Sequence, residues 1–326
     1  MPRGPTGIAA GRFSPSRGYG YIDSGWKRDA PPPAKGENSD VPCPTRRAMR
    51  LRICPCRYFT EKGGLFMLDS LIIALSMYSA VPMPQIEWRE NNMRWSLGCL
   101  PVVGLLCGGL VFGWTRLTAA FPVSPLFFAA VAVLLPILLA GGLHMDGFLD
   151  ATDALFSRRD REKKLAIMKD PNCGPFAVLC CAGLLLLEAG AWCQLMTAPG
   201  LLPAACSVYL LSRSLTVVAG SRFPYTPSST LGVLFASRAA KGVAALGTVE
   251  TALSLLLLLG LGGLFAGWRG LLAAAVAAIG AGLLFWWYRS MTQRQFGGIT
   301  GDLLGFFVEL SQLVMLFLLA LVSMFV

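Results

Sequence analysis

The sequence predicts an all-α polytopic membrane protein with about seven transmembrane helices and a short re-entrant or interfacial N-terminal helix. Of the 326 residues, 55% are hydrophobic and only 14% are charged, whereas soluble domains carry about 25% charged residues. The apolar residues form continuous blocks without the alternation typical of strands, and about 20 such residues cross a bilayer as a helix. The predicted spans are 95–116, 124–143, 175–196, 201–220, 249–267, 270–288 and 302–325.

Basic residues between the blocks predict their orientation. The loop at 144–174 contains six Lys and Arg residues, so we expect it on the cytoplasmic side. Alternation then places the loops at 221–247 and 289–300 on that side as well. The short connections near 117–123, 197–200 and 268–269 fall on the opposite side.

The first 66 residues have a different character from the rest. They are rich in Pro, Gly, Ser and Arg and lack a hydrophobic period, so we predict a disordered N-terminal extension before a membrane domain at 67–326. One explanation for the change at Met67 is that translation naturally starts there. The apolar segment 67–83 is at the short limit for a span, and a full crossing would put the basic N-terminus outside.

The net charge of +10 does not indicate nucleic-acid binding. Residues 1–66 hold 12 Lys and Arg against 5 Asp and Glu, and the remainder holds 16 against 13. The excess therefore lies in the N-terminal segment and the loops, where it orients membrane proteins or meets anionic headgroups. We expect a lipid bilayer and no nucleic acid as partner.

A polar interruption after the second predicted span contains the only histidine. Asp146, Asp150 and Asp153 stand at i, i+4 and i+7, which places three carboxylates on one helix face. Clustered carboxylates repel each other, and oxygen ligands of this kind suit Mg²⁺ bridging to phosphates. Gly147 lets a ligand or another helix approach the backbone, and His144 either orients an aspartate or acts as acid or base. The simpler alternative is a solvated acidic helix face.

The basic run that follows predicts a second short helix. Ser157 to Lys164, followed by LAIM, is typical of an N-capped amphipathic helix that ends at Asp170. Arg159 and Arg161 are the candidates for gripping a diphosphate beside a metal ion. The alternative is a basic interfacial helix on anionic lipid.

A second interruption, FGGITGDLLGFFVEL, precedes the last span. Gly298 and its neighbouring glycines predict a backbone bent around a ligand, and Thr300 and Asp302 are candidates for capping the helix. Glu309 lies about two turns into the apolar span. An intramembrane acid is a functional-site candidate by default, and the alternative is a hydrogen bond to a neighbouring helix.

Arg213, inside the predicted span 201–220, is a natural partner for a carboxylate or a phosphate. Together these residues predict a cytoplasm-facing intramembrane cavity lined by carboxylates and a few arginines and holding Mg²⁺. Such a cavity suits phosphoryl or diphosphate chemistry on an amphipathic substrate.

Five sequence motifs resemble those of the cobalamin synthase family, also called adenosylcobinamide-GDP ribazoletransferase. They are SMYSAVPMPQIEW, HMDGFLDATDA, REKKLAIMKDPNCG, SRSLTVVAGSRFPY and GGITGDLLG, in this order and with plausible spacing from about Met67 to the C-terminus. Two positions depart from the usual pattern of the family: Ala154 stands where Gly is commonest, and Ala80 stands where Arg is frequent.

The resemblance implies a Mg²⁺-dependent enzyme of the bacterial inner membrane with its active site facing the cytoplasm; its oligomeric state stays open. It would join adenosylcobinamide-GDP to α-ribazole or its 5′-phosphate, releasing GMP and forming adenosylcobalamin or its phosphate. The implied metal ligands are Asp146, Asp150 and Asp153, and the catalytic candidates are Asp153, Asp302 and His144. The substrate-binding candidates are Arg159, Arg161, Arg213, Gly147, Gly298, Thr300 and Glu309.

Two alternatives belong to other classes. A CDP-alcohol phosphotransferase would carry further aspartates after Asp153, where this chain has a basic run. A transporter would place its carboxylates at broken helices near the bilayer midplane, whereas these motifs lie at predicted helix ends and show no inverted repeat.

Overall fold

The described part of the chain consists of helices joined by short connections. The computed structural model describes residues 65–87, 90–227, 229 and 240–325, and their only strand-like feature is an isolated bridge between Tyr225 and Ile299. The all-α prediction is therefore confirmed, whereas the predictions for residues 1–64 lie outside the described residues. The helices are α1 (Leu65–Tyr78), α2 (Glu90–Ser96), η1 (Leu97–Cys99), α3 (Leu100–Thr118), α4 (Pro125–Leu139), α5 (Leu143–Phe156), α6 (Arg161–Ile167), α7 (Pro175–Leu195), η2 (Pro199–Leu201), α8 (Leu202–Arg222), α10 (Ala240–Gln295) and α11 (Gly301–Ser323).

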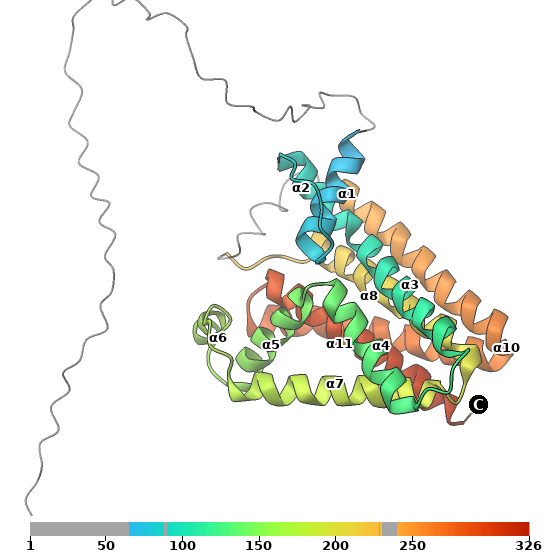
Figure 1. Cartoon of the computed structure of the whole chain (residues 1–326). Coiled ribbons are helices and arrows are strands. Elements are labelled where there is room, and N and C mark those ends of the chain that lie inside the picture. The colour runs from blue at the N-terminus through green and yellow to red at the C-terminus, as the bar shows by residue number, and fades with distance from the viewer. Residues whose placement is uncertain (1–64, 88–89, 228, 230–239, 326) are drawn as a thin grey trace, which may run out of the picture. The chain divides into compact units, whose positions relative to one another are not determined.

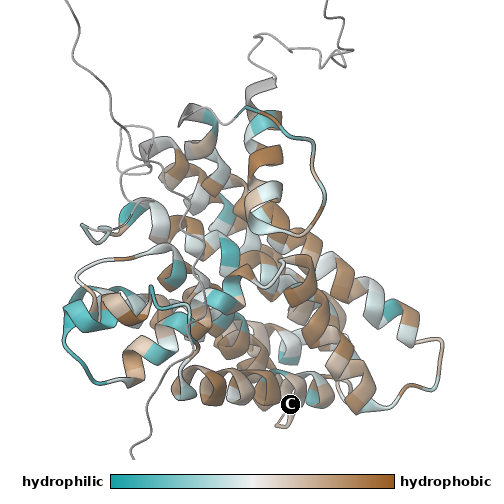
Figure 2. Cartoon of the chain, turned by 60° about the vertical axis from the view of Figure 1, so that its left-hand side comes forward, coloured by the Kyte–Doolittle hydropathy of each residue, from teal (hydrophilic) through white to brown (hydrophobic). Residues whose placement is uncertain are grey.

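Long apolar helices make this a multi-pass membrane protein. Their outer faces expose large apolar side chains, such as Leu186 at 74% and Leu264 at 76%, and most of their length is brown in Figure 2. An exterior of this kind is stable against lipid rather than water. Among the described residues, five segments are long and apolar enough to cross a bilayer: Leu97–Thr118, Pro175–Leu195, Pro199–Arg222, Gly242–Gln295 and Gly301–Ser323.

The longest helix, α10, consists of two arms. Its 56 residues would span about 84 Å if straight, far more than a bilayer of about 30 Å. Gly267 interrupts it with φ 64° and ψ −153°, a conformation open to glycine because it lacks a Cβ. A Cβ on Gly262 would lie 2.5 Å from the carbonyl oxygen of Gly270, so the chain folds back here. The break agrees with the predicted division between 249–267 and 270–288.

The predicted span at 124–143 contains a shorter helix that ends in a sharp bend. The helix α4 ends at Leu139, and α5 starts at Leu143 after a bend of 96°. Gly141 and Gly142 have φ values of 62° and 75°, which turn the chain at little steric cost. The aspartate motif therefore lies on a separate helix with its own direction.

The last helix, α11, lies at the centre of the bundle. It packs against α5, α7, α8 and α10. Figure 1 shows α7 running along α4, α5 and α11, and α3 beside α8, and the contacts between these helices agree. Two clusters of buried apolar residues form the interior. One, which includes Val103, Phe128, Trp192 and Leu316, lies among α3, α4, α7, α8, α10 and α11. The other, called the second core here, contains Met145, Phe148, Leu303 and Phe307 and is built mainly where α5 meets α11.

The helices α3 and α8 approach each other closely through glycine. A Cβ on Gly104 would lie 2.4 Å from the carbonyl oxygen of Tyr209, and one on Gly108 would lie 2.3 Å from that of Cys206. Small residues at such positions let helix backbones pack closely inside a membrane. This contact fixes α8, and with it Arg213, in the bundle.

The N-terminal helix α1 is too short to cross a bilayer. Its 14 residues span about 21 Å, and it packs against α2 and α3. Ser70, Ile73 and Ala74 on its inner face are fully buried. This agrees with the prediction that segment 67–83 does not form a full span.

The three segments predicted to share one side meet at one end of the bundle. The side chain of Arg161 donates to the carbonyl oxygen of Gln293 at 3.3 Å, and the backbone N–H of Ile299 donates to the oxygen of Pro224 at 2.9 Å. Two short connections also meet, since a Cβ on Gly200 would lie 2.7 Å from the oxygen of Phe265. The alternation of loops predicted from charge is therefore consistent with the packing.

We predict that Gly108→Ala destabilises the protein, because its Cβ would overlap the Cys206 carbonyl. Overpacking of this kind costs about 1–3 kcal/mol. Gly109→Ala is the matched control, since nothing lies within 4 Å of the added atom. Thermal unfolding of the detergent-solubilised protein measures both. Equal melting temperatures for the two variants would contradict the close α3–α8 contact.

Candidate active site at the crossing of α5 and α11

The three aspartates of the first motif lie on one face of α5, as predicted. Asp146 is exposed and Asp150 and Asp153 are half-buried. The opposite face of the helix carries His144, Phe148 and other buried residues and packs into the second core. The helix therefore holds its carboxylates along an open edge.

The second motif forms the first turn of α11. The hydroxyl of Thr300 accepts a hydrogen bond from the backbone N–H of Leu303 at 3.2 Å, which confirms Thr300 as the N-cap. The same hydroxyl lies 3.5 Å from Oδ2 of Asp302. Asp302 is half-buried, so its carboxylate remains partly open at the start of the helix.

Glycines bring the two motifs into contact. A Cβ on Gly147 would lie 2.6 Å from the carbonyl oxygen of Asp302, and one on Gly305 would lie 3.1 Å from that of His144. The rings of Phe148 and Phe306 stack at 5.6 Å beside this crossing. Of the two readings of Gly147, close approach of another helix is the one observed.

The crossing gathers four carboxylates from two helices. The negative charges of Asp146, Asp302 and Asp153 all act on Asp150, and the charge of Asp146 also acts on Asp302. Like charges at this range repel each other, and the repulsion grows as solvent is removed. A cation or a set of phosphate-bound cations would relieve it.

The carboxylate oxygens of these aspartates fit a hard cation that takes its remaining ligands from water and a substrate. Within the described ranges, no group of three or more His, Cys, Asp or Glu side chains is gathered closely enough to hold a metal ion by itself. The carboxylates instead present separate oxygen donors along one open edge. Mg²⁺ commonly binds to one or two carboxylates and keeps waters and substrate phosphates as its other ligands.

The carboxylate of Asp153 is set against the beginning of α7. A Cβ on Gly174 would lie 2.1 Å from both of its carboxylate oxygens, and Gly174 is the N-cap of α7. A helix N-terminus favours a negative charge. Gly174, the last residue of the REKKLAIMKDPNCG motif, thus allows the carboxylate of Asp153 to lie against the backbone.

The basic helix α6 starts later than predicted. Its N-cap is Asp160, which accepts a hydrogen bond from the backbone N–H of Lys163 at 3.0 Å. That bond lowers the pKa of Asp160. Ser157 is instead the C-cap of α5, and Arg158 between the two helices has φ 53°. Two consecutive caps therefore divide a run that looks continuous in the sequence.

The two candidate arginines differ in their surroundings. Both Arg159 and Arg161 are exposed. The guanidinium of Arg161 lies over the turn before α11, because a Cβ on Gly297 would be 2.8 Å from its Nη1. Gly297 has φ 79°, so glycine both makes this turn and leaves room for Arg161.

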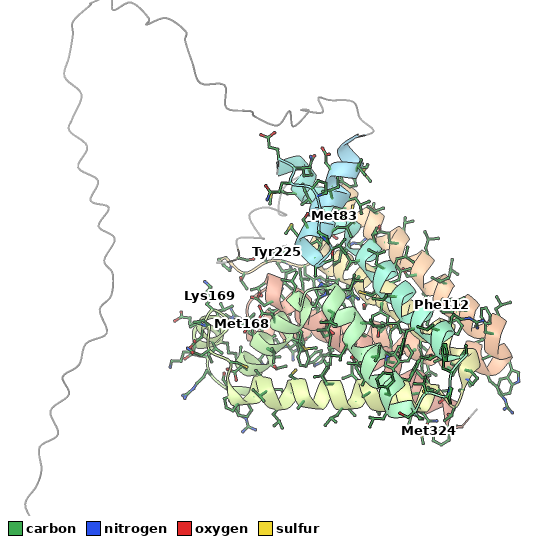
Figure 3. The ribbon with its side chains drawn as sticks, viewed as in Figure 1. Met83, Phe112, Met168, Lys169, Tyr225 and Met324 are labelled. Atoms are coloured by element: carbon green, nitrogen blue, oxygen red, sulfur yellow. The ribbon has the colours of Figure 1, made fainter. Side chains whose placement is uncertain are left out.

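A buried lysine that the sequence reasoning missed anchors α6. Lys164 is 5% exposed, and its Nζ donates to Oε1 of Gln295 at the end of α10. Met168 is buried in the second core, while Lys169 beside it is exposed; Figure 3 labels both. The buried side chains of Lys164 and Met168 attach α6 to the bundle, while Arg159 and Arg161 remain exposed to solvent.

Gly298 contacts another part of the backbone. With φ 154°, it lies against the segment after α8, where a Cβ would be 2.6 Å from the backbone N of Thr226. The Thr226 N–H also donates to the oxygen of Ile299 at 3.1 Å. The predicted bend in the backbone is therefore present. The segment after α8, and not a ligand, lies in the space beside Gly298.

Arg213 and Glu309 lie inside the bundle. Arg213 is 1% exposed and Glu309 is 4% exposed. Arg213 donates to Oε1 of Gln312 at 2.5 Å, and Nε2 of Gln312 donates to Oε2 of Glu309 at 2.9 Å. The predicted partnership of Arg213 with a carboxylate is therefore present, but it is indirect, because Gln312 lies between Arg213 and Glu309. The guanidinium is not open to a phosphate in this arrangement.

The two departures from the family pattern are both accommodated. Ala154 is fully buried on the inner face of α5. The backbone N–H of Ala80 donates to the oxygen of Leu139 at 2.7 Å, and its Cβ lies 3.5 Å from the position of a Cβ on Gly141. Ala80 therefore lies at the α4–α5 bend, close to the aspartate helix.

We predict that Asp150→Asn raises the melting temperature in EDTA by about 2–4 °C, because relieving repulsion of roughly 1 kcal/mol gives such a shift. Asp170→Asn is the control. Asp170 accepts hydrogen bonds from Asn172 at 2.9 and 2.7 Å, so neutralising it should give no rise. A fall for Asp150→Asn would show that the four carboxylates do not destabilise one another.

Comparison with known proteins gives the chain a family. Residues 70–320 match the family model described as cobalamin-5-phosphate synthase. An adenosylcobinamide-GDP ribazoletransferase of Lachnoclostridium phytofermentans is 32% identical over 245 residues, covering 74% of this chain and 89% of that protein. Those of Geobacillus thermodenitrificans and Pseudomonas savastanoi pv. phaseolicola are each 34% identical, covering 74% and 76% of this chain and 92% and 98% of those proteins. No solved structure matches. The chain belongs to the cobalamin-5-phosphate synthase family.

Proposed function

We propose that this protein transfers the cobinamide-phosphate group of adenosylcobinamide-GDP to α-ribazole or its 5′-phosphate, with release of GMP. The observation that supports this best is the crossing of α5 and α11, which combines the carboxylates of Asp150 and Asp302 at one open edge. The names of the relatives supply the substrate. The reaction joins a ribose hydroxyl oxygen to phosphorus and breaks the phosphorus–oxygen bond to GMP.

Asp146, Asp150 and Asp153 on α5 form an acidic edge, and Asp302 faces them from α11. Each Mg²⁺ ion would be held by one or two of these carboxylates, with water and substrate phosphate oxygens as its other ligands. When bound, Mg²⁺ neutralises the diphosphate and stabilises the charge on the leaving GMP. The exposure of Asp146 leaves the edge open to a large nucleotide substrate. Gly147 supports the edge by letting α11 approach.

Arg159 and Arg161 would bind the diphosphate from the other side. Both are exposed on the loop and the first turn of α6, and guanidinium groups bind phosphate oxygens in pairs. The anchoring of α6 by Lys164 keeps these arginines near the turn before α11.

A carboxylate would accept the proton of the attacking hydroxyl. Asp153 and Asp302 are the two candidates, since both are half-buried and lie where α5 meets another helix. Asp153 lies against Gly174 at the start of α7, and Asp302 lies beside Gly147. A general base of this kind acts within hydrogen-bond reach of its substrate. His144 is buried behind Gly305, so we assign it the role of positioning α5.

The site would face the cytoplasm in the bacterial inner membrane. The basic loop at 157–169 and the ends of α8 and α10 meet at the same end as the acidic edge. Basic residues favour the cytoplasmic side. An opening there would admit a nucleotide substrate from the cytoplasm.

We predict that Asp146→Asn and Asp302→Asn each lower GMP release at least about 100-fold, because removing one group that stabilises transition-state charge costs about 2.7–4 kcal/mol. The assay supplies adenosylcobinamide-GDP, α-ribazole and Mg²⁺ to the full chain in vesicles. Asp170→Asn is the matched control and should retain activity.

The wild-type result decides between the classes of protein. GMP release that requires acceptor and Mg²⁺ supports the transferase. Release of CMP from a CDP-alcohol, or substrate uptake without nucleotide release, would replace it with a CDP-alcohol phosphotransferase or a transporter.

We predict that Arg159→Ala raises the KM for adenosylcobinamide-GDP by about tenfold or more, since hydrogen bonds to charged groups contribute about 1.5–3 kcal/mol. The KM for α-ribazole should stay unchanged. Lys163→Ala is the control, because Lys163 is 66% exposed and pairs with Asp160 at 3.4 Å. An effect that disappears in vesicles without anionic lipid would show that Arg159 binds the membrane instead.

A further inference from the structure

A charged cluster lies in the interior of the bundle, apart from the acidic edge. It comprises Glu188 on α7, Arg213 on α8, and Glu309 and Gln312 on α11. Their side chains are between 1% and 4% exposed, and α11 packs against both α7 and α8. The sequence reasoning did not identify Glu188, although it is the only charged residue inside the apolar segment 175–196.

The cluster is continuous. Gln312 connects Arg213 to Glu309 through the hydrogen bonds described above, at 2.5 and 2.9 Å. Arg213 also donates to the backbone oxygen of Tyr209 at 3.2 Å. Glu188 lies within electrostatic range of both Arg213 and Glu309. One guanidinium therefore lies near two buried carboxylates, and it is linked to Glu309 by hydrogen bonds through Gln312.

The neighbouring groups supply no second cation. The titratable side chains that face the cluster are His144 from α5, Cys107 from α3, Cys181 from α7 and Tyr209 from α8. Cysteine and tyrosine side chains are never positively charged, and burial together with the charge of Arg213 disfavours the charged form of His144. If both carboxylates were ionised, the buried cluster would hold one uncompensated negative charge.

An uncompensated charge is costly at this place. Transfer of an unpaired carboxylate into low dielectric costs far more than transfer of a neutral acid. Polar atoms here also lack hydrogen-bond partners, namely Oε1 of Glu188, Nε of Arg213 and Nδ1 of His144. A proton bound to Oε1 of Glu188 would therefore displace no existing hydrogen bond.

We propose that Glu188 and Glu309 form a buried proton-binding site, in which Arg213 balances one carboxylate and a single bound proton neutralises the other. The ligand is the proton itself, and no bond other than the O–H bond forms. Gln312 fixes the orientation of Glu309 towards Arg213. The site keeps α11 neutral around Glu309, which lies about two turns after Asp302 in the same helix.

The first experiment tests the charge count by substitution of the full chain. Glu188→Gln and Glu309→Gln each replace one acid by a neutral isostere and leave Arg213 paired with the other. Each single variant should therefore keep its folded yield in membranes within about twofold of wild type. The double variant leaves a buried guanidinium unpaired, and its yield should fall by more than about tenfold.

A triple variant provides the rescue control. Adding Arg213→Gln to the double variant removes the unpaired charge, so the folded yield should recover at least in part. Single variants as damaging as the double would overturn the proposal, because both carboxylates would then be required in ionised form. A double variant that folds as well as wild type would also overturn it.

Infrared spectroscopy tests the proton directly and does not depend on yield. Wild type minus Glu188→Gln, recorded at neutral pH, should show the C=O stretch of a protonated carboxylic acid, and the band should shift in D₂O. Wild type minus Glu309→Gln should show the same band, since either substitution removes the shared proton. Absence of the band from both difference spectra would overturn the proposal.

Discussion

The close crossing of α5 and α11 is the contact on which the rest of the site depends. The two helices carry the two acidic motifs, which are about 150 residues apart in the chain, and they meet where Gly147 faces the backbone of Asp302. A side chain at this position would separate the helices and the carboxylates together. The stacked rings of Phe148 and Phe306 hold the same contact from the apolar side.

A membrane environment explains why the charges are divided into two groups. The bend after α4 turns α5 out of the direction of the preceding helix, so its aspartates lie along an open edge where repulsion is screened. Glu188, Arg213 and Glu309 are enclosed, so they must neutralise each other. One group is arranged to bind a cation and phosphates, and the other to keep the core uncharged.

Local pattern was sufficient to predict the helical class, most spans, the aspartate face and the N-cap at Thr300, because each depends on residues within one or two turns. It was not sufficient for Lys164 with Gln295, or for Gln312 between Arg213 and Glu309. Those pairs depend on which helix faces lie together, and helical periodicity within one segment does not contain that information. The paired glycines at 141 and 142 are a local signal for the bend after α4. Because the apolar run continues through them, however, hydropathy alone predicted a span up to residue 143.

The most direct measurement is the binding of Mn²⁺, as a paramagnetic substitute for Mg²⁺, to the full chain in the presence of a guanosine diphosphate ester. Electron paramagnetic resonance titration would compare wild type, Asp150→Asn and Asp302→Asn. A shared site predicts that substitutions on either helix weaken the same binding event. Unchanged Mn²⁺ affinity in Asp302→Asn, with loss in Asp150→Asn, would contradict the view that the crossing creates one site from two motifs.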